Sequence, residues 1–247
     1  MKQRSIKTPV SVIPPPFEIL YDCGPCLAVN KPPGILTQAP AGIDSLEVQI
    51  KRWLALRDGT RDPVYLAIIH RLDRPASGVL LFCRERNAAK KLSRQFEHRR
   101  VAKTYWAFVE GEVTPPEGTW TDYLYKIHGM AQAEVVSVDH AGAKEAILRY
   151  RVLCTTERGT WLEIELETGR THQIRVQAAS RGHPVVGDEQ YGSQTPFGRE
   201  HADPRDRAIA LHARSLAFTD PVTNRAIHLE AQPPADWTEL DLPLDFF

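Results

Sequence analysis

Residues 67–82 read AIIHRLDRPASGVLLF, in which two apolar runs enclose a short polar segment. Apolar runs bounded by turn-forming residues are typical of buried strands, and the proline and glycine between these runs indicate a loop. That loop carries Asp73 between Arg71 and Arg74. The stretch therefore predicts two buried strands joined by a loop with a cluster of charges.

The charged loop has two interpretations. An Asp–Arg pair can simply brace a tight turn, and exposed pairs of this kind are common. Alternatively, a carboxylate that neighbouring cations keep ionised can serve as a nucleophile or a base in a sheltered cleft. Taken alone, the loop leaves both the structural turn and the catalytic aspartate open.

The sequence on both sides of this loop predicts a fold rich in strands. Apolar patterns and turn signals predict further strands at residues 17–21, 26–30, 104–111, 144–154, 159–169 and 209–221. Three helices are predicted: one capped by Asp44, one capped by Asn87, and a short one from Thr171 to Gly182. Few connections are long enough for helical crossovers. The pattern favours an α+β fold with a long mixed, largely antiparallel β-sheet and flanking helices and loops.

Length and composition are those of one large globular domain. The chain has 247 residues, of which 42% are hydrophobic and 25% are charged. We expect a proline-rich tail at residues 1–16 and one folded domain over residues 17–247. No stretch reaches the roughly 18 apolar residues of a membrane span, and the first residues lack the apolar core of a secretion signal. The expected location is the cytoplasm.

Charge is unevenly distributed along a chain whose formal net charge is zero. The segment from Arg84 to Lys103 holds eight basic residues and two acidic ones. A local positive field of this kind attracts polyanions, although a solvated helix face has the same composition.

Cys23 and Cys26 form a C-x-x-C pattern, which is found in thiol oxidoreductases. A reactive thiol of that class lies at a helix N-terminus, where its pKa is lowered. Here strands are predicted before and after the pair, with Gly24 and Pro25 in the turn of a hairpin. A turn that happens to hold two thiols is the favoured interpretation, and redox chemistry is the alternative.

Six segments in the same order resemble motifs of the RluA-type pseudouridine synthases. The central one is HRLDRPASGVLL at residues 70–81, which is similar to the family's His-Arg-Leu-Asp motif. The others are AVNKPPGI (28–35), KTYWAFVEG (103–111), TGRTHQIRVQ (168–177), GHPVVGDEQYG (182–192) and LHARSLAF (211–218). The resemblance implies the family's α+β catalytic fold over residues 17–247 and isomerisation of uridine in RNA.

The resemblance also implies roles for individual residues. Asp73 matches the catalytic aspartate, whose attack on the sugar or on the base of the uridine stays open. Tyr105 matches the tyrosine that stacks on the uracil, with removal of the C5 proton as a second role left open. Arg175 matches the basic residue that pairs with the aspartate. Arg71 matches an arginine linked to displacing the flipped base. The other candidate substrate-binding residues are His70, Arg170, His172, Lys90, Lys91 and Arg94.

Two positions depart from the family pattern. Ala76 stands where threonine is frequent, and Gln177 where histidine is frequent. Both bear on loop geometry and RNA contacts rather than on the three core roles.

The reaction implied by the resemblance breaks the N1–C1′ bond, turns the base and joins C5 to C1′. The product contains the same atoms as the substrate, and no electrons are transferred, so we expect no cofactor and no metal. The histidines are also scattered, without the spacing of a zinc site. The expected partner is structured ribosomal or transfer RNA, with the protein acting as a monomer. A non-catalytic RNA-binding or RNA-folding protein remains the alternative from another functional class.

Overall fold

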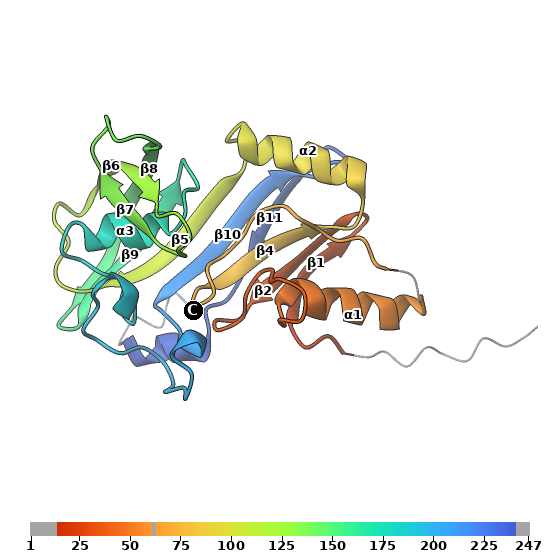
Figure 1. Cartoon of the computed structure of the whole chain (residues 1–247), viewed down its shortest axis with the longest axis horizontal. Helices are drawn as coiled ribbons and strands as arrows, with labels where there is room; N and C mark the ends of the chain where they lie inside the picture. The colour runs from red at the N-terminus through yellow and green to blue at the C-terminus, as the bar shows by residue number, and fades with distance from the viewer. Residues whose placement is uncertain (1–13, 61–62, 241–247) are drawn as a thin grey trace, which may run out of the picture.

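The computed structural model describes residues 14–60 and 63–240 (Figure 1). Within these residues one sheet of eleven strands dominates, and the predicted α+β class is confirmed. The strands are β1 (Glu18–Cys23), β2 (Cys26–Lys31), β3 (Ala67–Ile68), β4 (Ser77–Cys83), β5 (Ala102–Val109), β6 (Glu117–Lys126), β7 (Ala133–Val136), β8 (Lys144–Thr156), β9 (Gly159–Leu166), β10 (Leu211–Thr219) and β11 (Ala226–Glu230). The helices are α1 (Leu46–Asp58), α2 (Arg86–Glu97) and α3 (Gln173–Ala179), with short 3₁₀ turns at Glu189–Tyr191, Pro204–Asp206 and Ala235–Leu240.

Strand order along the sheet is β1-β2-β4-β10-β5-β9-β8-β6-β7, with β11 paired to β10 and β3 paired to β4. Among the pairs that the described residues form, β4 and β10 are parallel and the others are antiparallel. Gly78 lies in that parallel pair opposite Ala213, with φ +116°. A Cβ on Gly78 would come within 2.3 Å of the Ala213 carbonyl oxygen, so the close approach of the two strands requires glycine.

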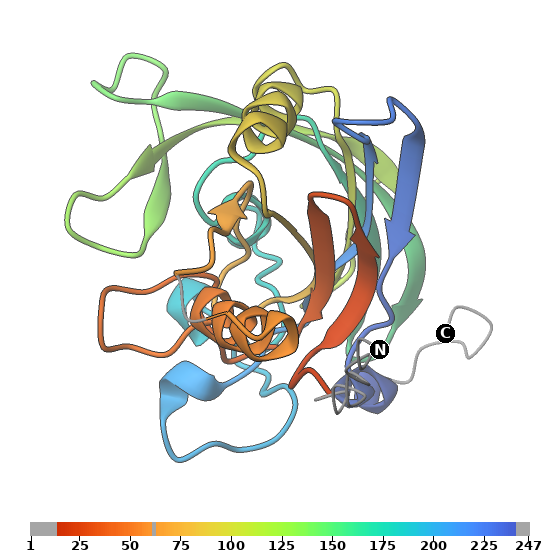
Figure 2. The ribbon, with the colours of Figure 1, turned by 90° about the vertical axis from the view of Figure 1, so that its right-hand side faces the viewer.

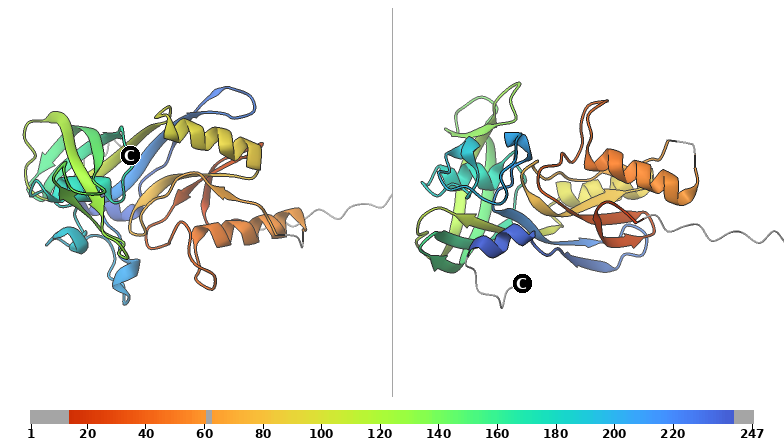
Figure 3. Two further views of the ribbon diagram at one scale, coloured as in Figure 1. Left: turned by 45° about the horizontal axis from the view of Figure 1, so that its top comes forward. Right: turned by 90° about the horizontal axis from the view of Figure 1, so that it is seen from below.

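Helices α1 and α2 cover opposite faces of the same strands (Figures 1 and 3). Leu80 and Phe82 of β4 pack in one cluster with α1, whereas Val79 and Leu81 pack in the other with α2. Successive side chains of a strand point to opposite faces, so all seven residues of β4 are buried. This explains the unbroken apolar run after the charged loop. The run before it is shorter than predicted, because β3 has two residues and both are half-buried.

The helix caps differ from the sequence prediction. The side chain of Ser45, and not that of Asp44, accepts a hydrogen bond from the Val48 N–H at the start of α1. Helix α2 begins at Arg86, so the predicted cap Asn87 lies inside it. The third helix is also shorter than predicted, since it runs from Gln173 to Ala179. Short polar residues cap helices interchangeably, so neighbouring candidates cannot be ranked from sequence.

The other half of the sheet carries α3 on its concave side. The buried amide of Gln177 donates hydrogen bonds to the carbonyl oxygens of Trp120 and Ala146 and to Asp122 Oδ2, at 3.2, 3.3 and 2.7 Å. Gln177 thus fastens α3 to β6 and β8. The β6–β7 hairpin and the loop to β8 project from the body of the protein beside this half (Figure 2).

No helix in residues 14–60 or 63–240 has the length and hydropathy of a membrane-crossing segment. The predicted proline-rich tail falls mostly on residues 1–13, outside the described residues.

Candidate active site

The loop between β3 and β4 is held from beneath by Lys31. This lysine is fully buried, and its Nζ donates hydrogen bonds to the carbonyl oxygens of Pro32, Arg74 and Ala76 at 2.9, 3.1 and 2.7 Å. Burial lowers the pKa of Lys31 to about 7, and the nearby charge of Asp73 opposes that shift. Three acceptors match the three N–H bonds of an ammonium group, so Lys31 fixes the backbone on the C-terminal side of Asp73.

Two further anchors hold the same loop. The hydroxyl of Thr37 donates to the Leu72 carbonyl and accepts from the Leu72 N–H, at 3.0 and 3.2 Å. Arg74 donates to the Gly34 carbonyl at 2.8 Å and to Asp206 at 2.6 Å. The backbone on both sides of Asp73 is therefore tied to segments far away in the sequence.

Asp73 faces a buried arginine from α3. Arg175 Nη1 donates to Asp73 Oδ2 at 3.2 Å, and the Arg175 side chain is 3% exposed. The same guanidinium donates twice to the buried Asp188, at 2.6 and 2.8 Å, and once to Gln190 at 2.8 Å. Burial opposes the charge of Arg175, but these carboxylates outweigh burial and raise its pKa. Arg175 is a permanent cation beside Asp73.

His172 contacts the other oxygen of Asp73, with 3.7 Å between its Nε2 and Oδ1. Its Nδ1 lies 2.8 Å from the Tyr191 hydroxyl, which also accepts from the Ala133 N–H at 3.0 Å. Burial lowers the pKa of His172, while the charge of Asp73 opposes that shift, so the ring is neutral at pH 7. The carboxylate favours a proton on Nε2, which leaves Nδ1 to accept from Tyr191.

Tyr105 lies on β5 in the lining of the same cleft as Asp73, and it is 9% exposed. Burial raises its pKa, and the charge of Asp73 raises it further, so the phenol keeps its proton at neutral pH. Lys103 precedes it by two residues on the same strand face. Burial lowers the pKa of Lys103 to about 8, with a smaller contribution from Arg99.

His70 is at the cleft but serves the fold. Its Nε2 accepts a hydrogen bond from the Leu81 N–H at 3.1 Å, and its ring stacks on Phe96 with centroids 4.9 Å apart. Burial lowers the pKa of His70 to about 3, with Lys103 adding to the shift. The neutral ring closes the turn that begins the Asp73 loop.

The remaining candidate residues fall into two groups. Arg71 and Arg170 line the cleft: Arg71 is exposed, and Arg170 Nε donates to the Glu145 carbonyl at 2.8 Å. Lys90, Lys91 and Arg94 lie along α2 and do not line the cleft.

The cleft has a volume of about 1790 Å³ and runs between the two halves of the sheet. Its basic lining residues are Arg71, Arg74, Arg99, Lys103, Lys126, Arg149, Arg170, Arg175, Arg205 and Arg207. Its acidic ones are Asp73, Glu97, Glu165, Glu167, Asp188 and Glu189. Ten cations against six carboxylates give the lining a net charge of +4, although the whole chain is formally neutral.

Cys23 and Cys26 occupy the last position of β1 and the first of β2, on either side of the predicted hairpin turn. Burial raises the pKa of the Cys26 thiol to about 12. A thiol that keeps its proton is a poor nucleophile. The pair therefore resembles a strand connection rather than a redox centre. The described residues also contain no cluster of three or more His, Cys, Asp or Glu side chains that could hold a metal ion.

Several residues of the site were not singled out from sequence. Asp188 and Gln190 hold Arg175, and Tyr191 contacts His172. Their signal is the motif at residues 182–192, which marked the segment but gave none of its residues a role. Lys31 lies in the matched segment 28–35, but its hydrogen bonds to the Asp73 loop become visible only in the structure, where the side chain is buried.

A family model described as RNA pseudouridylate synthase matches residues 25–180. One curated relative is the tRNA pseudouridine synthase C of Pasteurella multocida, which is 35% identical over 235 residues, or 91% of this chain and 94% of the relative. Another is the uncharacterized RNA pseudouridine synthase YhcT of Bacillus subtilis, 32% identical over 93% of this chain and 74% of the relative.

Solved structures share the fold at lower identity. Human RNA pseudouridylate synthase domain containing 4 superposes with a TM-score of 0.73 at 22% identity, covering 92% of this chain and 94% of that one. Human RNA pseudouridylate synthase domain containing 1 gives a TM-score of 0.68 at 24% identity over 92% of this chain and 86% of that one.

Proposed function

Because the chain belongs to the RNA pseudouridylate synthase family, we propose that it converts one uridine of a structured ribosomal or transfer RNA to pseudouridine, with Asp73 as the nucleophile. The observation that carries this proposal is the convergence of three side chains from distant segments. Asp73, Tyr105 and Arg175 line one cleft, and Asp73 lies 3.2 Å from the guanidinium of Arg175.

Asp73 suits the nucleophile's role because it combines a fixed position with an accessible oxygen. Its side chain is 27% exposed, whereas Arg175 behind it is 3% exposed. A cation at this distance favours the ionised carboxylate and restrains its orientation. The carboxylate forms a bond to the nucleotide, the N1–C1′ bond breaks, and the uracil turns. C5 then joins C1′, and the bond between Asp73 and the nucleotide breaks, which restores the free carboxylate. The C5 proton leaves and N1 gains one, so the reaction is an isomerisation.

Tyr105 suits a stacking role rather than that of a base at rest. Its raised pKa keeps the phenol protonated, and its ring contributes to the cleft wall near Asp73. A freed uracil needs a flat surface that holds it while it turns, and aromatic rings stack favourably on bases. Arg71, exposed at the cleft, suits the role of bracing the gap that the extruded nucleotide leaves.

The proposal includes extrusion of the target base. It is supported by the place of Asp73 in the lining of a cleft, which suits a single flipped nucleotide better than a uridine stacked in an RNA helix. Enzymes that act on bases typically flip them out at a cost of a few kcal/mol. The net charge of +4 in the cleft lining is available to offset part of that cost through the phosphates.

The choice of RNA class comes from the relatives. One is a tRNA pseudouridine synthase, and another is the ribosomal large subunit pseudouridine synthase C of Vibrio vulnificus, 31% identical over 216 residues. Their names give tRNA and the ribosomal large subunit, which supports a transfer or ribosomal RNA as the substrate of this chain.

The test is pseudouridine formation in total RNA from cells with and without the gene, repeated with purified protein and the RNA so identified. Wild-type protein should form one new pseudouridine. Asp73→Asn removes the charge but keeps the shape, so it should fold, bind RNA and form no product. Product from Asp73→Asn would refute the nucleophile. RNA binding without product from wild type would instead favour the non-catalytic RNA-binding alternative.

A further inference from the structure

Helix α2 presents a line of cations to solvent. Arg86, Lys90 and Arg94 are exposed and spaced four residues apart, so they lie on one face of the helix. The line is about 12 Å long, at 1.5 Å per residue. None of the three forms an ion pair with any residue in the described ranges.

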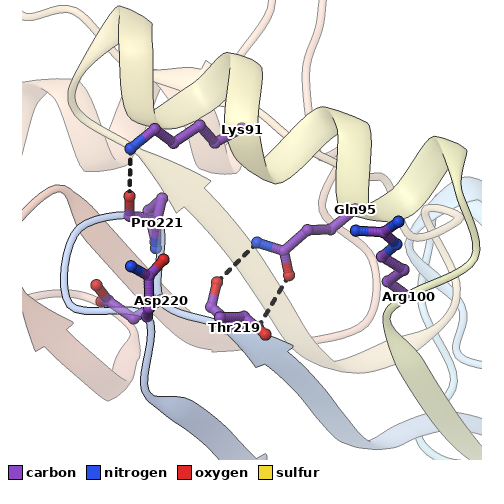
Figure 4. A pocket seen from close by; sticks show the side chains of 7 residues that line it. Lys91, Gln95, Arg100, Thr219, Asp220 and Pro221 are labelled. Atoms are coloured by element: carbon purple, nitrogen blue, oxygen red, sulfur yellow. Dashed lines mark hydrogen bonds between the residues drawn. The ribbon is translucent and has the colours of Figure 1, made fainter.

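Not every cation near α2 belongs to this line. Figure 4 shows Lys91 and Arg100 beside a small pocket between α2 and the turn after β10. Lys91 Nζ donates to the Pro221 carbonyl at 2.8 Å, and Asp220 lies in the same pocket. Lys91 is therefore held against its own fold, one residue away from the unpaired Lys90.

The line on α2 continues into the cleft. Phe96 and Glu97, at the end of α2, line the cleft. Arg99, in the connection after α2, and Lys103, the second residue of β5, line it too. Arg99 is exposed, whereas Lys103 is half-buried on the same strand face as Tyr105. Neither Arg99 nor Lys103 has a hydrogen-bond or ion-pair partner among the side chains of the described residues. The two link the exposed face of α2 to the site of Tyr105.

The opposite wall of the cleft is different. Its arginines are already paired: Arg149 with Glu167 at 2.6 Å, Arg205 with Asp203 at 3.1 Å, and Arg207 with Glu189. Two cations of that wall lack a carboxylate partner among the described residues: Lys126 at the β6–β7 turn, and Arg170, whose Nε donates to the Glu145 carbonyl. Paired arginines are partly neutralised, whereas the α2 side combines Arg99 and Lys103 with the three exposed cations of α2, so it holds the longer run of cations without a carboxylate partner.

We propose that Arg86, Lys90, Arg94, Arg99 and Lys103 form a basic track that binds the phosphates of the RNA strand on one side of the target uridine. The track rests on the proposed function, and it extends the substrate site beyond the cleft. Phosphates are recognised by unpaired Lys and Arg side chains, and each contact releases bound counterions. The track holds no base-reading geometry, so it contributes affinity and direction of entry rather than sequence choice.

The test compares salt dependence in two double variants. Lys90→Ala/Arg94→Ala removes two track cations. The matched control Lys51→Ala/Arg52→Ala removes two cations from α1 that are paired with Glu47 and Asp44. Each phosphate contact contributes about 0.7–0.9 to the slope of log affinity against log salt.

RNA binding is measured between 50 and 200 mM salt with the RNA that wild type modifies. The track variant should lose about 1.4–1.8 of slope and bind about tenfold or more weakly at 50 mM. Its KM should rise while its single-turnover rate at saturating RNA holds. The control variant should keep the wild-type slope. The single variants refine the map, since Lys90→Ala should lower the slope by about 0.7–0.9 and Lys91→Ala should not.

The outcomes separate the track from the enzymatic proposal. If Lys90→Ala/Arg94→Ala keeps the wild-type slope while wild type makes pseudouridine, the track is wrong and the enzyme stands. An equal loss of slope in the α1 control would also overturn the track, because the effect would then be one of total charge. If wild type binds RNA but makes no product, the enzymatic proposal fails on its own.

Discussion

Replacing Arg175 with methionine tests how strongly one buried guanidinium holds the site together. Arg175 donates two hydrogen bonds to Asp188, one to Gln190 and one to Asp73. Methionine fills a similar length without charge, so Arg175→Met leaves Asp188, which is 1% exposed, as a buried carboxylate without a cation. Breaking one partner of a buried ion pair costs about 3–5 kcal/mol. That is a large share of the roughly 5–15 kcal/mol that stabilises a typical domain.

A second substitution separates stability from catalysis. Arg175→Met/Asp188→Asn removes the orphaned charge, so about 2 kcal/mol or more of the lost stability should return. Activity should not return, because Asp73 still lacks the cation that lies 3.2 Å away in the wild type. We expect both variants to form product at about 1% of the wild-type rate or less, as when one preorganised electrostatic partner is removed.

Urea unfolding gives the stabilities, and pseudouridine formation under single-turnover conditions gives the rates. If the free energy of unfolding of Arg175→Met lies within about 1 kcal/mol of the wild-type value, the buried Arg175–Asp188 pair does not stabilise the fold by the expected amount. If the double variant retains more than a tenth of the wild-type rate, Asp73 does not depend on the guanidinium.

Two further predictions concern His172 and His212. Tyr191→Phe removes the hydroxyl between His172 and the Ala133 N–H, so it should cost about 1 kcal/mol and slow single-turnover product formation several-fold. An unchanged rate would show that the orientation of His172 is set elsewhere. Burial lowers the pKa of His212 from 6.5 to about 4, so the unfolded chain takes up a proton that the folded protein resists. The contribution of His212 to the free energy of unfolding is complete above pH 6.5 and falls by about 3 kcal/mol on acidification to pH 4. The urea midpoint of His212→Gln should therefore fall less steeply over this pH range than that of wild type. Equal slopes for the two proteins would contradict the assignment.

Much of the fold could be predicted because burial leaves a periodic trace in the sequence. β5, β8, β9 and β10 lie at the predicted positions within a few residues, and the residues after the charged loop form β4. The pairing of strands was harder to predict from the sequence than their positions. The parallel contact of β4 with β10 joins residues 135 positions apart, His212 and Ser77, and no local pattern encodes it. Strands β6, β7 and β11 were not predicted.

The site was predictable only in part. The ordered motifs singled out Asp73, Tyr105 and Arg175, and the structure brings these three to one cleft. Asp188 is one of 31 acidic residues, and its pairing with Arg175 depends on a chain path that residue types do not specify. The reach of Lys31 across to the Asp73 loop was equally hidden, because an exposed lysine and a buried one look alike in sequence.

The hydrogen bonds of Lys31 to three carbonyl oxygens bear on whether the protein or the RNA changes conformation when the two bind. Lys31 and Thr37 both hold the backbone around Asp73 by hydrogen bonds. A movement of this loop toward a bound uridine would therefore break hydrogen bonds in the protein's interior. The RNA, rather than this loop, then has to change conformation for the uridine to reach Asp73. Uridines in hairpin tips, bulges and poorly stacked junctions, which unfold at little expense, should be modified far faster than the same uridine inside an uninterrupted duplex.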